Sequence, residues 1–409
     1  MTLAGVKRAE AELLVPTYDR QPVLFRRGRG CYLWDAAGRR YLDFLSGIGV
    51  NALGHGHPAV RRALAAQAGR LLHVSNLFYH DYQAALARRL AKISGLDRVF
   101  FTNSGTEAIE GALKLARAYA RLHSSNGHKP RWRILALENS FHGRTFAALA
   151  ATGQKKYRAP FAPLVPGVRF VRFNDVRDLE RQFDSSVCAI LVEPIQGEGG
   201  IQPLTREFFA RARALTRRGN ALLIADEIQS GLCRTGRWFA YEHYGIQPDI
   251  VTVAKPLAAG LPLGAILARE RVALAFHPGM HGTTFGGGPL ACAVALAFLE
   301  TIERERLLAR VRRVGGYFRA RLEELKKKYD WIREVRGLGL MVGVELALPG
   351  KAIVREALAR GVILNCTHDT VLRFLPPYIV TERQVDNVIA TLEEVFAGVD
   401  AEQRSAKKK

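Results

Sequence analysis

Two apolar segments that each end in a charged residue constrain the fold more than any other feature of the chain. Ala221–Ala225 precedes Asp226, and a second apolar run that begins at Ile250 precedes Lys255. Similar short runs alternate with helical patterns along the chain, and this alternation predicts a mostly parallel sheet covered by helices on both faces. In such α/β folds ligands bind beyond the carboxyl ends of the strands. We therefore expect both charged residues at the ligand-binding edge of the sheet.

The chain is too long for one ordinary core, since it has 409 residues. A large domain is predicted over residues 51–287, because strands and helices alternate there. From residue 288 the pattern changes to a long helical stretch over 288–328 followed by strands and helices of a smaller α+β domain, which extends to residue 400. Residues 1–50 are predicted to join this small domain, and the basic tail 401–409 is predicted to be disordered.

Composition excludes several classes of protein and leaves one question open. No apolar stretch is long enough to span a bilayer, and no signal segment is evident, so a cytoplasmic protein is expected. The five cysteines are scattered without CxxC spacing, which argues against a disulfide framework or a metal site. The net charge of +22 suits either nucleic acid or small anionic substrates. The absence of a recognition motif with interleaved aromatic residues favours the second.

Asp226 and Lys255 together predict a site for pyridoxal phosphate. A lysine can form the Schiff base with this cofactor, while an aspartate keeps the pyridine nitrogen protonated so that the ring accepts electrons. Burial at a strand end lowers the pKa of a lysine and makes its amine nucleophilic. Gln229 is a candidate partner for the ring hydroxyl. The alternatives are that Asp226 caps a helix and that Lys255 is a surface residue.

Two further segments supply partners for the phosphate and the ring. Gly105 and Thr106 follow a short strand and open a helix, where free N–H groups favour an anion. Phe141 can stack on a pyridine ring, and Arg144 can bind a carboxylate through two parallel hydrogen bonds. The alternatives are an ordinary helix cap, a core phenylalanine and a surface arginine.

A third group of residues fits the demands of two different substrates. Arg373 is predicted on a strand, and an arginine that must admit two substrates can be masked by a carboxylate in one half-reaction. We predict that Glu198 is that carboxylate, although a structural salt bridge or two unrelated charges would explain the pattern equally well. Thr283 and Thr284 lie in a glycine-rich loop, 281–289, whose hydroxyls suit a phosphate.

Taken in order, these motifs resemble the ornithine/acetylornithine branch of the class III, fold-type I pyridoxal-phosphate aminotransferases. The resemblance covers nearly the whole chain, from about Gly30 to Pro377. Leu53–Pro58, Ser75–Tyr79 and Phe141–Arg144 are similar to the acetylornithine subgroup.

The resemblance implies a role for each candidate residue and a homodimer with shared active sites. These roles are Schiff-base lysine (Lys255), phosphate binding (Gly105, Thr106), ring stacking (Phe141), pairing with the ring nitrogen (Asp226) and hydroxyl (Gln229), phosphate binding across the dimer (Thr284), carboxylate binding (Arg144, Arg373), control of Arg373 (Glu198) and substrate contact (Thr283).

The resemblance also implies the reaction, although the sequence departs from the family in places. Pro256 follows the lysine where alanine is common, and Gly288 replaces an asparagine. Ile48 replaces the tyrosine of ornithine aminotransferases, which favours an N-acylated donor. We therefore expect transfer of the δ-amino group of N-acetylornithine to 2-oxoglutarate, giving N-acetylglutamate 5-semialdehyde and glutamate in arginine biosynthesis. The alternatives are ornithine, 4-aminobutyrate, succinyl-diaminopimelate or carrier-bound lysine as donor, and a nucleic-acid-binding protein on this scaffold.

Overall fold

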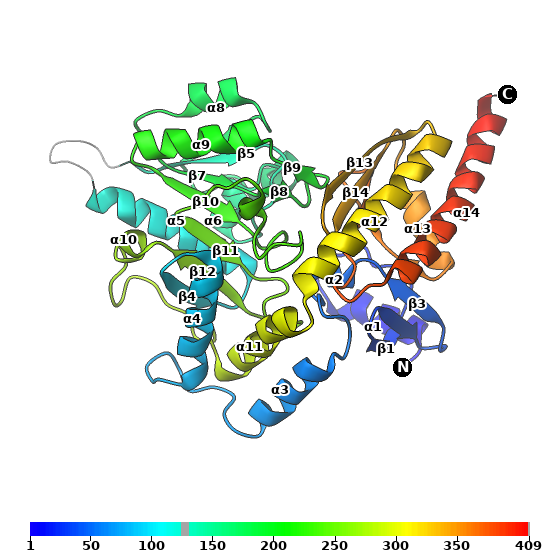
Figure 1. Ribbon diagram of the computed structural model, residues 1–409, viewed down its shortest axis with the longest axis horizontal. Coiled ribbons are helices and arrows are strands. Elements are labelled where there is room, and N and C mark those ends of the chain that lie inside the picture. Colours follow the sequence, from blue (N-terminus) through cyan, green and yellow to red (C-terminus); the bar gives the residue numbers. More distant parts are fainter. Residues whose placement is uncertain (124–130, 408–409) are drawn as a thin grey trace.

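The computed structural model describes residues 1–123 and 131–407, which form a larger and a smaller body (Figure 1). Within these residues, a seven-stranded sheet has the order β4-β12-β11-β10-β7-β5-β6, and all of its strands are parallel except β12. Its strands are β4 (Arg98–Thr102), β5 (Arg133–Leu137), β6 (Val168–Val171), β7 (Val187–Val192), β10 (Leu222–Asp226), β11 (Ile250–Val253) and β12 (Gly264–Ala268). The predicted α/β fold with a mostly parallel sheet is confirmed.

The strands β7, β10, β11 and β12 are buried throughout, as expected for a mostly parallel sheet with helices on both faces. Along β10, Leu222 and Ile224 pack into a core with the long helix α5, whereas Leu223 and Ala225 pack into a second core with α9. The helices of this body are α3 (Pro58–Ala68), α4 (Asp81–Ser94), α5 (Gly105–Leu122), α6 (Phe146–Ala151), α7 (Lys155–Arg158), η1 (Ala159–Phe161), α8 (Val176–Gln182), α9 (Arg206–Arg218), η2 (Ala240–His243), α10 (Glu270–Ala273) and α11 (Pro289–Arg304).

The smaller body contains an antiparallel sheet of order β13-β14-β17-β16, with helices packed beside it (Figure 1). Its elements are α12 (Leu307–Lys328), β13 (Ile332–Leu338), β14 (Met341–Leu346), α13 (Lys351–Ala359), β15 (Val362–Ile363), β16 (Asn365–Thr367), β17 (Val371–Phe374) and α14 (Glu382–Lys407). A two-stranded ribbon, β8 (Ile195–Gln196) and β9 (Gln202–Pro203), lies between β7 and α9 in the sequence.

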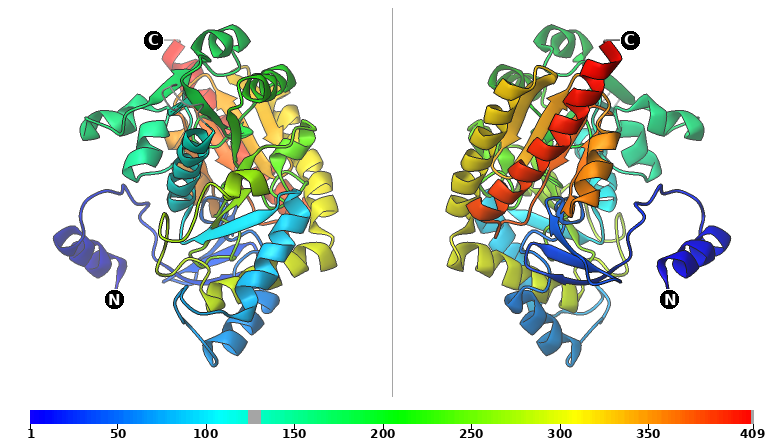
Figure 2. Two further views of the ribbon diagram at one scale, coloured as in Figure 1. Left: turned by 90° about the vertical axis from the view of Figure 1, so that its left-hand side faces the viewer. Right: turned by 90° about the vertical axis from the view of Figure 1, so that its right-hand side faces the viewer.

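The N-terminal residues form a second small sheet with the C-terminal part of the chain. β3 pairs in parallel with β15, so that Leu42 lies opposite Val362. The first helix, α1, stands away from the rest of the chain (Figure 2). The elements of this segment are α1 (Leu3–Leu13), β1 (Phe25–Arg29), β2 (Tyr32–Asp35), β3 (Arg40–Asp43) and α2 (Ser46–Gly49). The domain boundaries at residues 50, 287 and 400 stay predictions.

One helical prediction needs correction. The pattern over 288–328 forms two helices rather than one, because Arg306 adopts a left-handed conformation (φ 51°) between α11 and α12. The helix α14 continues to Lys407. The disorder of the tail 401–409 stays a prediction. Residues 408–409 lie outside the described residues. Among the described helices, none has both the length and the apolar sequence that crossing a bilayer requires.

Candidate active site

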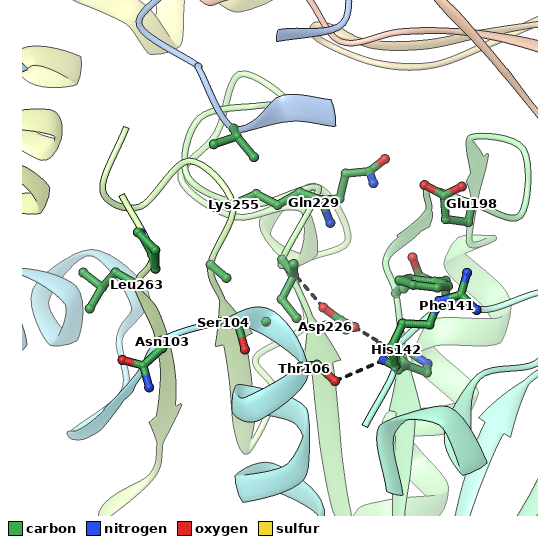
Figure 3. Close-up of a pocket in the computed structure, with 18 of the residues that line it drawn as sticks. Asn103, Ser104, Thr106, Phe141, His142, Glu198, Asp226, Gln229, Lys255 and Leu263 are labelled. Atoms are coloured by element: carbon green, nitrogen blue, oxygen red, sulfur yellow. Dashed lines mark hydrogen bonds and ion pairs between the residues drawn. The ribbon is translucent and has the colours of Figure 1, made fainter. Parts of the chain in front are cut away.

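A cavity of about 390 Å³ lies at the carboxyl edge of the parallel strands (Figure 3). It is lined by the turn between β4 and α5, the loop after β5 and the segments that follow β7, β10 and β11. Most of the residues predicted from the sequence line this cavity, namely Gly105, Thr106, Phe141, Arg144, Glu198, Asp226, Gln229 and Lys255.

Asp226 and Lys255 lie on two hydrogen-bonded parallel strands. Asp226 is the last residue of β10, and it pairs in register with Thr252 of β11, three residues before the lysine. Burial lowers the pKa of the Lys255 amine below its ordinary value, although the charge of Asp226 partly opposes this effect. A neutral amine is a nucleophile and a base, so Lys255 is suited to attack a carbonyl carbon or to carry a proton.

His142, which the sequence analysis did not select, lies directly behind Asp226. Its Nδ1 is 2.7 Å from Asp226 Oδ2, and both side chains are buried. The other carboxylate oxygen accepts the backbone N–H of Ile228 at 3.1 Å. His142 Nε2 has no hydrogen-bond partner within the part of the chain that the structure describes. The imidazole therefore orients the carboxylate, and its only sequence signal was its place beside Phe141.

The start of α5 forms one end of the cavity. Gly105 is the first residue of the helix, and a Cβ at this position would lie 2.8 Å from Ile228 Cδ1, so a larger residue would not fit. The Thr106 hydroxyl accepts the backbone N–H groups of Arg144 and Thr145, each at 3.2 Å. A helix start with a glycine and a hydroxyl attracts an anion, because its N–H groups carry partial positive charge.

Phe141 and Arg144 come from the loop after β5, and the Arg144 guanidinium lies 5.5 Å from the centre of the Phe141 ring. The Phe141 ring faces the cavity (Figure 3), and its backbone N–H donates to Glu193 Oε2 at 2.9 Å. The Arg144 side chain is exposed, and its guanidinium lies 4.0 Å from the centre of the Tyr157 ring. Arg144 is therefore accessible to a carboxylate that enters from solvent.

Glu198 and Arg373 form an ion pair at the rim of the cavity, although they come from different bodies. Arg373, on β17, is buried, and its Nη1 lies 2.5 Å from Glu198 Oε1. Its Nε donates to Asn365 Oδ1 at 3.0 Å. Burial raises the pKa of Glu198, but the charge and hydrogen bond of Arg373 outweigh burial and hold it below its ordinary value. The pair predicted from sequence therefore exists as a contact.

Thr283 and Thr284 do not line this cavity. The Thr283 hydroxyl accepts from Asn103 Nδ2 at 3.1 Å and from the backbone N–H of Gly286 at 3.2 Å, so it supports a cavity residue from behind. Thr284 is exposed and borders a neighbouring hollow. Within a single chain, Thr284 is not brought to the Lys255 site.

With this geometry established, comparison with known proteins decides the family. The family model for class III aminotransferases matches residues 15–396. The chain belongs to the class III aminotransferase family. It is therefore an enzyme that depends on pyridoxal phosphate and moves an amino group between a donor and a keto acid.

Curated and solved relatives of this class III aminotransferase match along nearly its full length. It is 48% identical over 383 residues to acetylornithine aminotransferase of Methanocaldococcus jannaschii, covering 93% of this chain and 95% of that protein. Identity is 47% over 391 residues to acetylornithine aminotransferase of Caldanaerobacter subterraneus, covering 95% of this chain and 98% of that protein. The structure of ornithine aminotransferase from Toxoplasma gondii superposes with a TM-score of 0.93 at 36% identity, covering 98% of this chain and 96% of that one.

Proposed function

We propose that this enzyme transfers the δ-amino group of N-acetylornithine to 2-oxoglutarate, giving N-acetylglutamate 5-semialdehyde and glutamate, a step of arginine biosynthesis. The observation that carries the proposal is that Asp226, Lys255 and Glu198 line one cavity, and that Glu198 is paired there with Arg373. The names of the relatives from M. jannaschii and C. subterraneus support N-acetylornithine as the donor.

The residues present fit pyridoxal phosphate. The start of α5, with Gly105 and Thr106, would hold the phosphate, Phe141 would cover one face of the ring, and Asp226 would meet the ring nitrogen. Gln229 Oε1 is buried and has no hydrogen-bond partner among the described residues, so it is free to accept from the ring hydroxyl. When bound, this cofactor supplies an electron sink for the carbon that loses its proton.

Lys255 performs the proton transfer in this proposal. Because burial lowers its pKa, the amine gives up its proton more readily than an exposed lysine does. We assign Lys255 Nζ to remove the proton from the carbon that bears the transferred amino group. Positioned acid–base catalysis of this kind contributes roughly 10²–10⁴-fold to a rate.

Arg144 and Arg373 divide the carboxylates of the two substrates. Arg144 is exposed at the mouth and binds the α-carboxylate of N-acetylornithine. During the amine half-reaction Arg373 is masked by Glu198, because the carbon of N-acetylornithine that bears the δ-amino group carries no carboxylate. It is released for the second carboxylate of 2-oxoglutarate, with which a guanidinium forms two parallel hydrogen bonds. Thr283 supports the substrate side through Asn103.

The partners of the cavity carboxylates favour an N-acylated donor over free ornithine. Among the described residues that line the cavity, each carboxylate already has a partner: Glu193 accepts two backbone N–H groups, Glu198 pairs with Arg373, and Asp226 pairs with His142. A second free ammonium group would therefore have to displace one of these contacts to reach a carboxylate. The remaining wall is apolar and suits an acetyl group, with Val50, Leu261, Pro262 and Leu263.

The active unit in this proposal is a homodimer in which Thr284 binds the phosphate of the partner subunit's cofactor. Its support is an exposed apolar surface around the loop of Thr284, formed by Phe285 together with Leu77, Phe78 and Tyr79. Asn76 Nδ2 donates to the carbonyl of Thr283 at 3.1 Å and thus joins the two segments.

The described cysteines are all unpaired, which is consistent with the reducing cytoplasm.

Initial rates with a panel of donors test the choice of substrate. The purified enzyme would be assayed with 2-oxoglutarate and, in turn, N-acetylornithine, ornithine, 4-aminobutyrate, succinyl-diaminopimelate and lysine. We expect the highest kcat/KM with N-acetylornithine and at least about a tenfold loss with free ornithine, because its extra ammonium would have to displace an existing contact of a cavity carboxylate. A higher kcat/KM for any other donor would contradict the proposed substrate.

A further inference from the structure

Glu193 connects two loops that the sequence analysis treated separately. It directly follows the last residue of β7, and its side chain is only 6% exposed. Its Oε2 accepts the backbone N–H of Phe141 at 2.9 Å, and its Oε1 accepts the backbone N–H of Gly197 at 3.1 Å. One carboxylate thus holds the loop that carries the aromatic ring and the loop that carries Glu198.

The contacts around Gly197 leave little freedom for this part of the chain. A Cβ on Gly197 would lie 2.4 Å from Gln229 Oε1, so the loop packs directly against a residue of the cavity. Gly197 immediately precedes Glu198, whose carboxylate contacts Arg373. A shift of the Gly197 backbone would therefore displace both the ion pair at the rim and the side chain of Gln229.

The charge of Glu193 is costly to bury, which indicates that it does more than fill space. Burial is the main cause that raises the pKa of the Glu193 carboxyl to about 7; the charge of Asp226 acts in the same direction, while His142 and the two backbone N–H groups oppose it. The charges of Glu193 and Lys255 also act on each other. A carboxylate accepts with both oxygens, whereas a protonated carboxyl loses one acceptor. The two-loop contact therefore depends on the ionised form.

We propose that Glu193 is a positioning residue that fixes the Phe141 and Gly197 backbones together, so that Glu198 can release Arg373 by moving its side chain alone. The inference rests on the proposed function, because it assumes that Glu198 releases Arg373 only in the 2-oxoglutarate half-reaction. Without the hydrogen bond from Gly197 to Glu193, the backbone before Glu198 would move together with the Glu198 side chain. Arg373 would then bind 2-oxoglutarate less well.

The test is Glu193→Gln, with Glu227→Gln as the matched control. Glutamine keeps the size of the side chain but offers only one acceptor, so one of the two loops must lose its bond. Glu227 is also buried beyond a strand end and accepts from Ser230 Oγ at 2.6 Å and from the Tyr241 N–H at 2.8 Å, yet it does not line the cavity.

Two measurements separate positioning from general stability. In Glu193→Gln we expect kcat/KM of the 2-oxoglutarate half-reaction to fall about tenfold, and that of the amine half-reaction to fall several times less. In the cofactor-free protein, peptides that contain Phe141 or Gly197 should exchange their amide hydrogens about tenfold faster. Glu227→Gln should change neither value. Equal losses in both half-reactions, or unchanged exchange, would overturn the proposal.

The wild-type protein provides a second test if Glu193→Gln does not fold. Its kcat/KM for the 2-oxoglutarate half-reaction should fall as the pH is lowered through about 7, where Glu193 takes up a proton. The Glu227→Gln variant should show the same fall in kcat/KM as the wild type. If the fall is absent in Glu227→Gln, it is caused by protonation of Glu227, and the proposal is overturned. If the wild type performs neither half-reaction, the proposed function has failed, whereas amide exchange in a folded Glu193→Gln still decides whether Glu193 holds both loops.

Discussion

The floor of the cavity and its rim hold their charged residues in different ways. On the floor, Asp226 ends β10 and Lys255 follows the neighbouring strand β11, so the strand register determines their separation. At the rim, Glu198 comes from a loop of the larger body and meets Arg373 on a strand of the smaller one. A floor that is part of a continuous core remains in place, whereas an ion pair between two bodies can open. The comparison suggests that fixed chemistry resides on the floor and substrate exchange at the rim.

The largest expected effect comes from removing the amine on the floor. Lys255→Ala should lower kcat by roughly 10⁴-fold, because both the nucleophile and the proton carrier are lost. Far-ultraviolet circular dichroism should be unchanged, since the strands do not depend on this side chain. The exposed Lys351→Ala is the control and should keep wild-type activity. Substantial turnover by Lys255→Ala would show that the reaction does not need the Lys255 amine.

A smaller loss is expected from neutralising the carboxylate beside that amine. Asp226→Asn keeps the shape and the contact with His142 but removes the charge that would favour a protonated ring nitrogen. We expect kcat to fall roughly 10²–10³-fold, as for other fixed electrostatic groups in active sites. Steady-state kinetics measure this, with the exposed Asp97→Asn as the control. A change in KM alone would show that the carboxylate acts only in binding.

At the rim, the effect should depend on the substrate. Arg373→Ala should raise KM for 2-oxoglutarate by about 10²-fold, because a buried charge that binds a carboxylate is lost. The amine half-reaction should change far less, since Arg373 is masked by Glu198 at that stage. Arg321→Ala, on α12, removes an ion pair with Asp386 and should alter neither half-reaction. Equal losses in both half-reactions would contradict the division between floor and rim.

The smallest expected effect concerns the stability that the folded protein loses by burying the Lys255 amine. The pKa of Lys255 is lower in the folded than in the unfolded protein, so the unfolded chain binds more protons and stability rises with pH across that window. Lys255→Met should therefore raise Tm of the cofactor-free protein at neutral pH, by roughly 1 °C for each kcal/mol gained in a chain of 409 residues. The gain should shrink as the pH approaches the ordinary lysine pKa of 10.5, as calorimetry would show. A gain that is independent of pH would exclude this cause.

The floor could be predicted from the sequence, because consecutive parallel strands place their final residues at one edge of the sheet. The Glu198–Arg373 contact was also anticipated, but as a hypothesis about substrate exchange rather than from any local pattern. His142 and Glu193 were not selected, since their importance depends on contacts with Asp226 and with two backbone N–H groups that no spacing reveals. The position of Thr284 outside the cavity likewise depends on how its loop folds.

The visible absorption spectrum of the purified enzyme with bound pyridoxal phosphate tests the central claim most directly. The claim is that one cavity, with Lys255 on its floor and Arg373 at its rim, serves both half-reactions. N-acetylornithine should abolish the visible band of the cofactor, and 2-oxoglutarate added after removal of the donor should restore it. A band that N-acetylornithine leaves unchanged, or that 2-oxoglutarate fails to restore, would contradict the account.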